Sequence, residues 1–245
     1  KKDDSLVSRE VLSTKETKLY DGMVDYELDE PNVCVLDFAK WKFNDGEWND
    51  EDEVLKVDAK VRQLNGMETR SGGMLQPWFA KLHDHKVYGD VELEYEFYVD
   101  EIPTGDVYIA AERPENWDYS INGVKLACED FSDIWIDVCF KKMLVPKGAI
   151  KLGLNKVTAR TSFMRTTNIE AVYVLGSFGV KLDGKKKTIT TLPKEIAFEN
   201  LVNYNLPFYT GCVTYKLNAQ KVKSLIGDVS NKRVVLSPKS FTGAL

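Results

Sequence analysis

The sequence predicts an all-β fold, and three observations support this prediction. Apolar and polar residues alternate with period two over several segments, as in strands that bury one face. Turn-forming residues separate these segments at intervals of about ten residues. Helical periodicity is scarce, with one short candidate at residues 219–226 that Gly227 would end. This combination is typical of a β-sandwich or jelly roll.

The alternation is clearest in residues 91–99, where apolar residues alternate with Glu92, Glu94 and Glu96. Residues 107–111 show another such face. In two further segments we expect the alternate apolar residues to face the core: Ile134, Ile136, Val138 and Phe140, and then Ile150, Leu152 and Leu154. Other strand-like runs cover residues 169–175, 213–217 and 233–236. Asn122-Gly123 is the strongest turn signal, because both residues tolerate the positive φ of a tight hairpin.

Turn-forming residues and changes of composition divide the chain into three parts and one connecting segment. Residues 1–85 are mixed and polar, and we expect an irregular N-terminal segment there. Residues 86–182 hold about six strands, enough to close a jelly-roll sandwich. Residues 185–193 are a linker or a crossing strand. Residues 194–245 hold too few strands to bury both faces of a sandwich, so they are interpreted as the truncated start of a second one.

Composition excludes several classes of partner. The chain has 43% hydrophobic and 29% charged residues, as in ordinary globular proteins. No run approaches the roughly 18 apolar residues of a membrane-spanning helix, so no membrane partner is expected. The 33 basic and 38 acidic residues give a net charge of −5. Nucleic-acid binding needs a basic stripe, and the one basic run at residues 185–187 lacks a neighbouring aromatic platform.

The sequence offers weak metal signals and therefore predicts no cofactor. An acidic cluster comprises Asp45, Glu47, Asp50, Glu51, Asp52 and Glu53. We interpret it as a solvated loop, with a structural calcium ion as the alternative, although the spacing of an EF-hand loop is absent. His83 and His85 would share one face of an extended segment, but no third ligand is evident.

The four cysteines are Cys34, Cys128, Cys139 and Cys212, and none forms a Cys-x-x-Cys pair. We expect buried reduced thiols at the three that sit in apolar runs, Cys34, Cys139 and Cys212. A disulfide between Cys128 and Cys139 is the alternative and would indicate an oxidising compartment.

Several segments resemble parts of large glycoside hydrolases. Residues 115–124, Glu-Asn-Trp-Asp-Tyr-Ser-Ile-Asn-Gly-Val, resemble the strand and hairpin of sugar-binding domains in family 2 enzymes. Residues 26–37, 76–78 and 168–180 resemble the region after the catalytic barrel in bacterial enzymes of the rhamnosidase and β-galactosidase type. Residues 206–211 are similar to the opening of the next jelly roll in such enzymes. The order of these motifs along the chain carries the resemblance.

The resemblance implies a galactose-binding-like jelly roll that is a non-catalytic accessory region of a glycoside hydrolase. Its partners would be carbohydrate and the catalytic barrel of the parent enzyme. The strand–helix alternation of such a barrel is missing here, so the family's catalytic carboxylates cannot be assigned to any residue of this chain. A structural spacer or interaction module without its own ligand is the competing interpretation.

Five residues are candidates for carbohydrate binding. The indoles of Trp78 and Trp117 could stack on the C–H face of a pyranose. Glu112, Arg113 and Asp118 could bind its hydroxyl groups. Trp117 would share a strand face with Tyr119 and Ile121, which favours a core position for Trp117 over a sugar platform.

Overall fold

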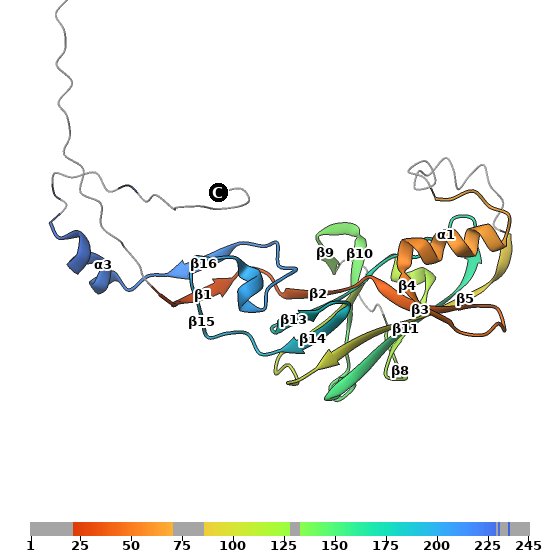
Figure 1. The fold of residues 1–245 in the computed structure, drawn as a ribbon, viewed down its shortest axis with the longest axis horizontal. Coiled ribbons are helices and arrows are strands. Elements are labelled where there is room, and N and C mark those ends of the chain that lie inside the picture. The colour runs from red at the N-terminus through yellow and green to blue at the C-terminus, as the bar shows by residue number, and fades with distance from the viewer. Residues whose placement is uncertain (1–21, 71–85, 128–132, 229, 231–234, 236–245) are drawn as a thin grey trace, which may run out of the picture.

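The computed structural model describes residues 22–70, 86–127, 133–228, 230 and 235. The protein is mostly β, with 45% strand, two helices in the described part and several antiparallel sheets. Two large sheets pack face to face and form a two-sheet body (Figure 1). A small three-stranded sheet and the helix α3 lie at one end of the long axis, and the helix α1 lies toward the other end.

The first large sheet has five antiparallel strands. Their order across the sheet is β2 (Asn32–Leu36), β12 (Val172–Gly176), β6 (Val107–Glu112), β10 (Asp137–Leu144) and β9 (Ile134–Trp135). Neighbouring strands in this sheet come from distant parts of the sequence, as where Val35 pairs with Tyr173 and Tyr173 with Ala110. The sheet therefore forms only when both chain halves are present.

The second large sheet has eight strands. Six of them follow the order β13 (Gly179–Asp183), β14 (Lys186–Thr190), β5 (Val87–Val99), β11 (Gly153–Met164), β7 (Asp118–Ile121) and β8 (Val124–Lys125). The other two are β3 (Phe38–Phe43), which pairs with β5, and β4 (Asn49–Glu53), which pairs with β3. The strands β14 and β5 pair in parallel. Residues 185–193 were expected to be a linker or a crossing strand, and most of them therefore form a strand within this sheet.

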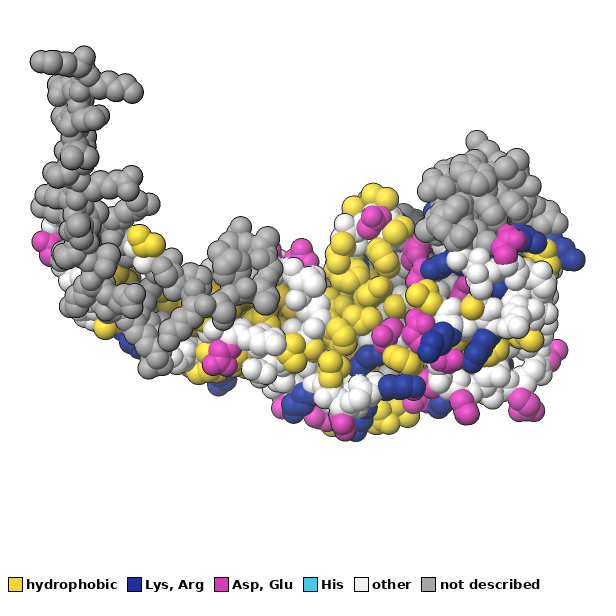
Figure 2. Space-filling view, turned by 45° about the horizontal axis from the view of Figure 1, so that its top comes forward, with side chains coloured by type: hydrophobic (Ala, Val, Ile, Leu, Met, Phe, Trp, Pro, Cys, Tyr) yellow, Lys and Arg dark blue, Asp and Glu magenta, His cyan; other side chains and the backbone are white. Residues whose placement is uncertain are grey.

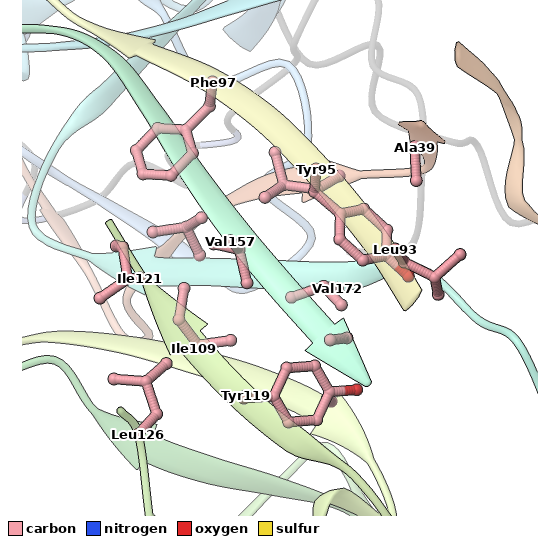
Figure 3. Close-up of a cluster of buried hydrophobic side chains, with 14 of the residues drawn as sticks. Ala39, Leu93, Tyr95, Phe97, Ile109, Tyr119, Ile121, Leu126, Val157 and Val172 are labelled. Carbon is pink, nitrogen blue, oxygen red and sulfur yellow. The ribbon is translucent and has the colours of Figure 1, made fainter. Parts of the chain in front are cut away.

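The main core lies between the two large sheets. Leu93, Tyr95 and Phe97 of β5 are buried, and their alternation with glutamates confirms the predicted strand over residues 91–99. Figure 3 shows them in one cluster with Ile109 of β6 and Val172 of β12. Burial of each large apolar side chain contributes about 1.5–3 kcal/mol, so this interface dominates the stability of the fold.

The outer face of the eight-stranded sheet carries ion pairs instead. The glutamates of β5 lie opposite basic residues of β3 and β11, where charge complementarity across strands is favourable. The N–O distances are 2.9 Å for Lys42–Glu92, 2.8 Å for Lys40–Glu96, 2.8 Å for Lys156–Glu94 and 3.0 Å for Arg160–Asp90. This face is therefore a solvated, charge-paired surface.

Residues 22–70 are not irregular, which corrects the expectation for the N-terminal segment. The strand β2 pairs with β12 of the five-stranded sheet, and β3 pairs with β5 of the eight-stranded sheet. A boundary at residue 85 would thus cut both sheets. Short strands such as β2 and β3 are hard to recognise locally, because their pairing partners lie far away in the sequence.

The helix α1 (Val54–Leu64) was not predicted. Val54, Val57 and Val61 are buried on one side of it, at the spacing of a helix face. The Glu53 side chain caps its N-terminus by accepting hydrogen bonds from the N–H groups of Leu55 and Lys56. The expectation of a single helix was therefore wrong, and the signal that could have revealed α1 was this valine spacing after an acidic residue.

A buried ion pair attaches α1 to the body. Arg62 Nε lies 2.7 Å from Asp58 Oδ2, and the two side chains are 0% and 3% exposed. The Arg62 guanidinium also donates to the carbonyl oxygens of Arg165 (3.0 Å) and Thr167 (2.6 Å). These backbone hydrogen bonds to the Arg62 guanidinium help to offset the free-energy cost of burying the Asp58–Arg62 ion pair.

In two predicted strand segments, side chains that were expected to face the core are exposed to solvent. Ile136 and Val138 are 70% and 73% exposed, whereas Met143 of β10 points inward. Ile136 has a left-handed φ of 63°, and the β9–β10 register shifts between Asp137 and Lys141, so the alternation is interrupted there. Leu152 and Leu154 are also exposed, although Ile150 is buried. Apart from Val235, residues 233–236 lie outside the described residues.

Two local predictions are confirmed. The Asn122-Gly123 turn joins β7 to β8, with φ values of 48° and 82°. The helix α3 covers Ala219–Ile226, begins after the Asn218 cap and ends at Gly227, whose φ is 68°. Neither helix of the described residues is long and apolar enough to span a membrane.

The small sheet joins both ends of the described chain. Its central strand β1 (Val24–Leu28) pairs with β15 (Glu195–Ile196) and with β16 (Val213–Lys216). The segment expected to begin a second sandwich thus takes its central strand from the N-terminal part. The Tyr209 hydroxyl donates to Asp29 Oδ1 at 2.7 Å. This bond connects the segment that precedes β16 to the turn that follows β1. A short 3₁₀ helix, Leu201–Tyr204, lies between β15 and β16.

Replacing Arg62 with Met should lower the free energy of unfolding by about 3–5 kcal/mol, because the Asp58 carboxylate would stay buried without its positively charged partner. Urea denaturation followed by circular dichroism measures this change. Lys60→Met is the matched control on the same helix, since Lys60 forms an exposed ion pair with Asp52 that contributes under about 1 kcal/mol. Equal losses in the two variants would contradict the role given to the buried pair.

Acid stability should depend on the Asp29–Tyr209 hydrogen bond. This bond is the main cause that lowers the pKa of Asp29, so its stabilising contribution is present above the unfolded pKa and is lost as the pH falls through the lowered folded value. In Tyr209→Phe the Asp29 pKa should rise, which NMR titration of its side-chain carboxyl carbon can measure. Asp137, whose pKa is lowered mainly by a hydrogen bond from the Cys139 N–H, should not move. An unchanged Asp29 pKa in the variant would refute the assignment.

Candidate functional site

The predicted polar residues Glu112 and Arg113 lie where the chain leaves one large sheet for the other. Glu112 ends β6, and the short 3₁₀ helix Pro114–Asn116 leads to Asp118 at the start of β7. Arg113 adopts a left-handed conformation with a φ of 46°, which is uncommon for a residue with a side chain. Its N–H donates to the Cys139 carbonyl oxygen at 2.8 Å, which holds this turn against β10.

The five predicted residues do not form one site. Trp117 is partly buried, packs against the main core and places its ring 6.2 Å from that of Tyr119. Asp118 is exposed and pairs with Lys125 at 3.5 Å on the eight-stranded sheet. Trp78 lies outside the described residues. The structure leaves Glu112 and Arg113 together, beside a set of aromatic residues that the sequence did not point to.

These aromatic residues lie on the outer face of the five-stranded sheet, which we call the aromatic face. They alternate with side chains that point into the main core, so each strand contributes to both surfaces. The residues of the aromatic face are Val33, Val35, Tyr108, Ala110, Trp135, Phe140, Tyr173 and Leu175. Val33, Ala110 and Leu175 are buried among them, and the others keep part of their surface exposed. Figure 2 shows a patch of hydrophobic side chains near the middle of the molecule.

Three rings contact one another at the centre of the aromatic face. The ring centroids of Trp135 and Tyr173 are 4.9 Å apart, and those of Phe140 and Tyr173 are 5.5 Å apart in an edge-to-face arrangement. Trp135 and Phe140 are 6.0 Å apart, also edge to face. Such pairs contribute about 0.5–1.5 kcal/mol beyond their burial, so the rings are held in fixed positions. The Trp135 Nε1–H is buried and has no acceptor among the described residues.

Polar groups border the rings. Glu112 pairs across the sheet with Phe140 and is partly exposed. Lys142 lies 5.1 Å from the centroid of the Tyr108 ring, a cation–π contact, and forms a 2.7 Å ion pair with Asp133. The aromatic face therefore has hydrogen-bond acceptors and donors at its edge.

A second carboxylate lies near Glu112. Burial raises the pKa of Glu170, the Arg70 guanidinium that pairs with it opposes this shift, and the negative charge of Glu112 adds to it. The pKa of Tyr173 is also raised, first by burial and then by the charge of Glu170. Perturbed groups of this kind gather at functional sites more often than elsewhere. The sequence analysis missed Glu170 and Arg70, because nothing local indicates that they meet across 100 residues.

The two outer faces of the body therefore differ in chemistry. The eight-stranded sheet presents lysine–glutamate pairs that neutralise one another, whereas the five-stranded sheet presents rings and aliphatic side chains. An exposed apolar surface is unfavourable in water unless it has a function or a covering partner. The alternation of Tyr108 and Tyr173 with buried aliphatic neighbours is the sequence signal that could have indicated this face.

The acidic cluster at residues 45–53 has structural partners. Glu53 caps α1, Asp52 pairs with Lys60 at 2.7 Å, and Glu51 lies 3.8 Å from Lys185. Among the described residues, no three His, Cys, Asp or Glu side chains converge as a metal site. His83 and His85 lie outside the described part of the chain.

The cysteines differ in their environments. Cys34 is buried, and burial raises its pKa to about 12. Cys139 is a partly buried free thiol, which does not support the alternative of a disulfide with Cys128. Burial raises the pKa of the Cys139 thiol to about 11. Cys212 is exposed, which corrects the expectation of a buried thiol there. Cys128 itself lies outside the described residues.

Comparisons with family models, with curated proteins and with solved structures give no match for this chain. The case for a function therefore depends on the geometry of the aromatic face and on the charges at its border.

Proposed function

We propose that this chain is a non-catalytic accessory module of a glycoside hydrolase, with a jelly-roll-like, galactose-binding-like sandwich that binds carbohydrate on its aromatic face. The observation that carries the proposal is the set of contacting, partly exposed rings of Trp135, Phe140 and Tyr173 on one outer sheet face. The axial C–H groups of a pyranose stack favourably on such rings.

The border residues supply what sugar hydroxyls require. A hydroxyl both donates and accepts hydrogen bonds, so a sugar site needs groups of both kinds. Glu112 provides acceptors next to Phe140, and Lys142 provides donors beside Tyr108. The Trp135 indole N–H is buried without an acceptor among the described residues, so in this proposal the ring contributes its face rather than its N–H group.

The resemblance to glycoside hydrolases supports the same ligand class. Residues 115–124, which carry the family 2 likeness, form the approach to β7 and the β7–β8 hairpin. In this proposal they are part of the scaffold, since Trp117 packs against the core. The catalytic barrel of a larger parent enzyme would be the neighbouring domain.

A second candidate function, protein contact, is favoured by the β9–β10 hairpin. Ile134, Ile136 and Val138 are exposed there, next to the aromatic face. Ile136 has a left-handed φ of 63°, a genuine outlier for a β-branched residue. Three exposed aliphatic side chains on one hairpin favour a contact with another protein surface, as in an interaction module or spacer.

Glycan-array screening tests the carbohydrate proposal. The wild-type chain should bind a subset of arrayed glycans, and Trp135→Ala should weaken that binding about tenfold, since a stacked ring contributes about 1 kcal/mol or more. Glu112→Ala should weaken it about fivefold through loss of hydrogen bonds. Trp48→Ala is the matched control, because Trp48 is an exposed indole elsewhere in the chain, beside Lys42. Binding to no glycan, or equal losses in the Trp48 and Trp135 variants, would overturn the proposal.

The protein-contact candidate makes a separate prediction. Ile136→Asp with Val138→Asp should reduce binding of an apolar fluorescent dye and any concentration-dependent association measured by sedimentation, because it places charge on the exposed hairpin. Leu182→Asp is the control, since Leu182 is an exposed aliphatic residue outside the hairpin, on the edge strand β13. If both variants change dye binding and association alike, the hairpin has no special role as a contact surface.

A further inference from the structure

Glu112 is a carboxylate of the aromatic face that has no basic partner among the described residues. Its side chain is partly exposed, so a ligand can reach it. Three other carboxylates lie on this face or beside it, and each pairs with a cation: Asp37 with Lys187, Asp133 with Lys142, and Glu170 with Arg70. The pairs cancel one another, and the charge of Glu112 remains.

The strand register places Glu112 next to the rings of this face. It lies directly opposite Phe140 of β10, and Ala110, two residues before it on β6, lies opposite Tyr173 of β12. Residues two apart on a strand share a face of the sheet, so all four belong to the same outer surface. Trp135 contacts both rings, with centroid distances of 6.0 Å to Phe140 and 4.9 Å to Tyr173. A ligand that rests on these rings therefore lies within reach of the Glu112 carboxylate.

Negative charge surrounds this group of rings. The pKa of the Tyr173 hydroxyl is raised, first by burial and then by the charges of three carboxylates, those of Glu170, Asp37 and Glu112. The face of an aromatic ring is itself negative, because of its quadrupole, and attracts a cation placed over it. The rings and the carboxylates thus favour the same sign of charge in a ligand.

The basic residues nearest to the rings do not neutralise Glu112. Lys142 lies over the Tyr108 ring and forms its 2.7 Å ion pair with Asp133. Arg113, which follows Glu112 in the chain, is exposed and forms no ion pair with it in the described structure. A partly buried charge is more favourable with a counter-charge than without one. Glu112 therefore favours a ligand that brings a positive charge.

This inference rests on the proposed function and names the class of sugar more closely. A neutral sugar would stack on the rings and leave the charge of Glu112 uncompensated, and an anionic sugar would be repelled by it. A protonated amine would donate a charge-assisted hydrogen bond to Glu112 and add a cation–π contact. We propose that the aromatic face selects a saccharide that carries a protonated amine, whose ammonium group binds Glu112 while the pyranose stacks on the three contacting rings.

Three oligosaccharides of the same linkage and length test this selection: oligomers of glucosamine, of N-acetylglucosamine and of glucose. In isothermal titration calorimetry the wild-type chain should bind the glucosamine oligomer about tenfold more tightly than the other two, because a charge-assisted hydrogen bond is about twice as strong as a neutral one. Raising the pH above the pKa of the sugar amine should remove this preference, since the amine then carries no charge.

The variant Glu112→Gln should bring the three affinities together, because the amide keeps hydrogen-bonding groups but loses the charge. Its affinity for the glucose oligomer should stay close to that of the wild type. Glu115→Gln is the matched control, since Glu115 is an exposed glutamate three residues along the chain and the change in net charge is the same. Glu112 has no ion pair to lose, so thermal unfolding of its variant should match the wild type and show that the variant is folded.

The outcomes separate this inference from the proposed function. Equal binding of the three oligomers that is weakened in Trp135→Ala would overturn the selection for an amine and leave carbohydrate binding in place. Binding of none of the three, or of any other glycan, would remove both. A preference that survives in Glu112→Gln, or that Glu115→Gln removes equally, would exclude Glu112 as the selecting group. Tighter binding of an oligolysine peptide than of the glucosamine oligomer would assign the face to a protein ligand and refute the inference.

Discussion

The pairing of β5 with β11 is the constraint on which the rest of the structure depends. These strands pair from Val99 opposite Gly153 to Val87 opposite Met164, the longest strand pairing among the described residues. Their inner residues build most of one wall of the core. The strands β3, β7 and β14 each attach to one of these two, so their positions follow from it. The five-stranded sheet then packs on the wall that this pair creates.

Strand alternation makes the two outer faces a consequence of the same core. Once Leu93, Tyr95 and Phe97 are buried, the glutamates of β5 must face solvent, where the lysines of β3 and β11 pair with them. On the opposite sheet, burying Ile109 and Val174 turns Tyr108 and Tyr173 outward. Exposed ion pairs stabilise little, but they keep a surface soluble. A partly exposed aromatic surface has no such benefit, which is why we propose this surface as the binding face.

The small sheet introduces a different requirement, because its strands come from both ends of the described chain. Its junction with the body relies on buried polar groups: the Asn32 amide binds two carbonyl oxygens, and the Val180 N–H donates to the Asn205 carbonyl at 2.7 Å. Such groups specify one arrangement only if all of them are satisfied. Asn32 Oδ1, which is buried and has no donor among the described residues, is the exception at this junction.

The sequence by itself determined the β class, the strand at residues 91–99, the Asn122-Gly123 turn and the short helix that ends at Gly227. All of these depend on local periodicity or on backbone freedom at one or two residues. Glu112 was also found beside the aromatic face, but Trp135, Phe140, Tyr173 and Glu170 were not. Only the tertiary structure decided which way residues 134–140 face, because one left-handed residue and a register shift interrupt the alternation. It also decided that β2 and β3 belong to the large sheets, since strand pairing across more than fifty residues leaves no mark in the local pattern.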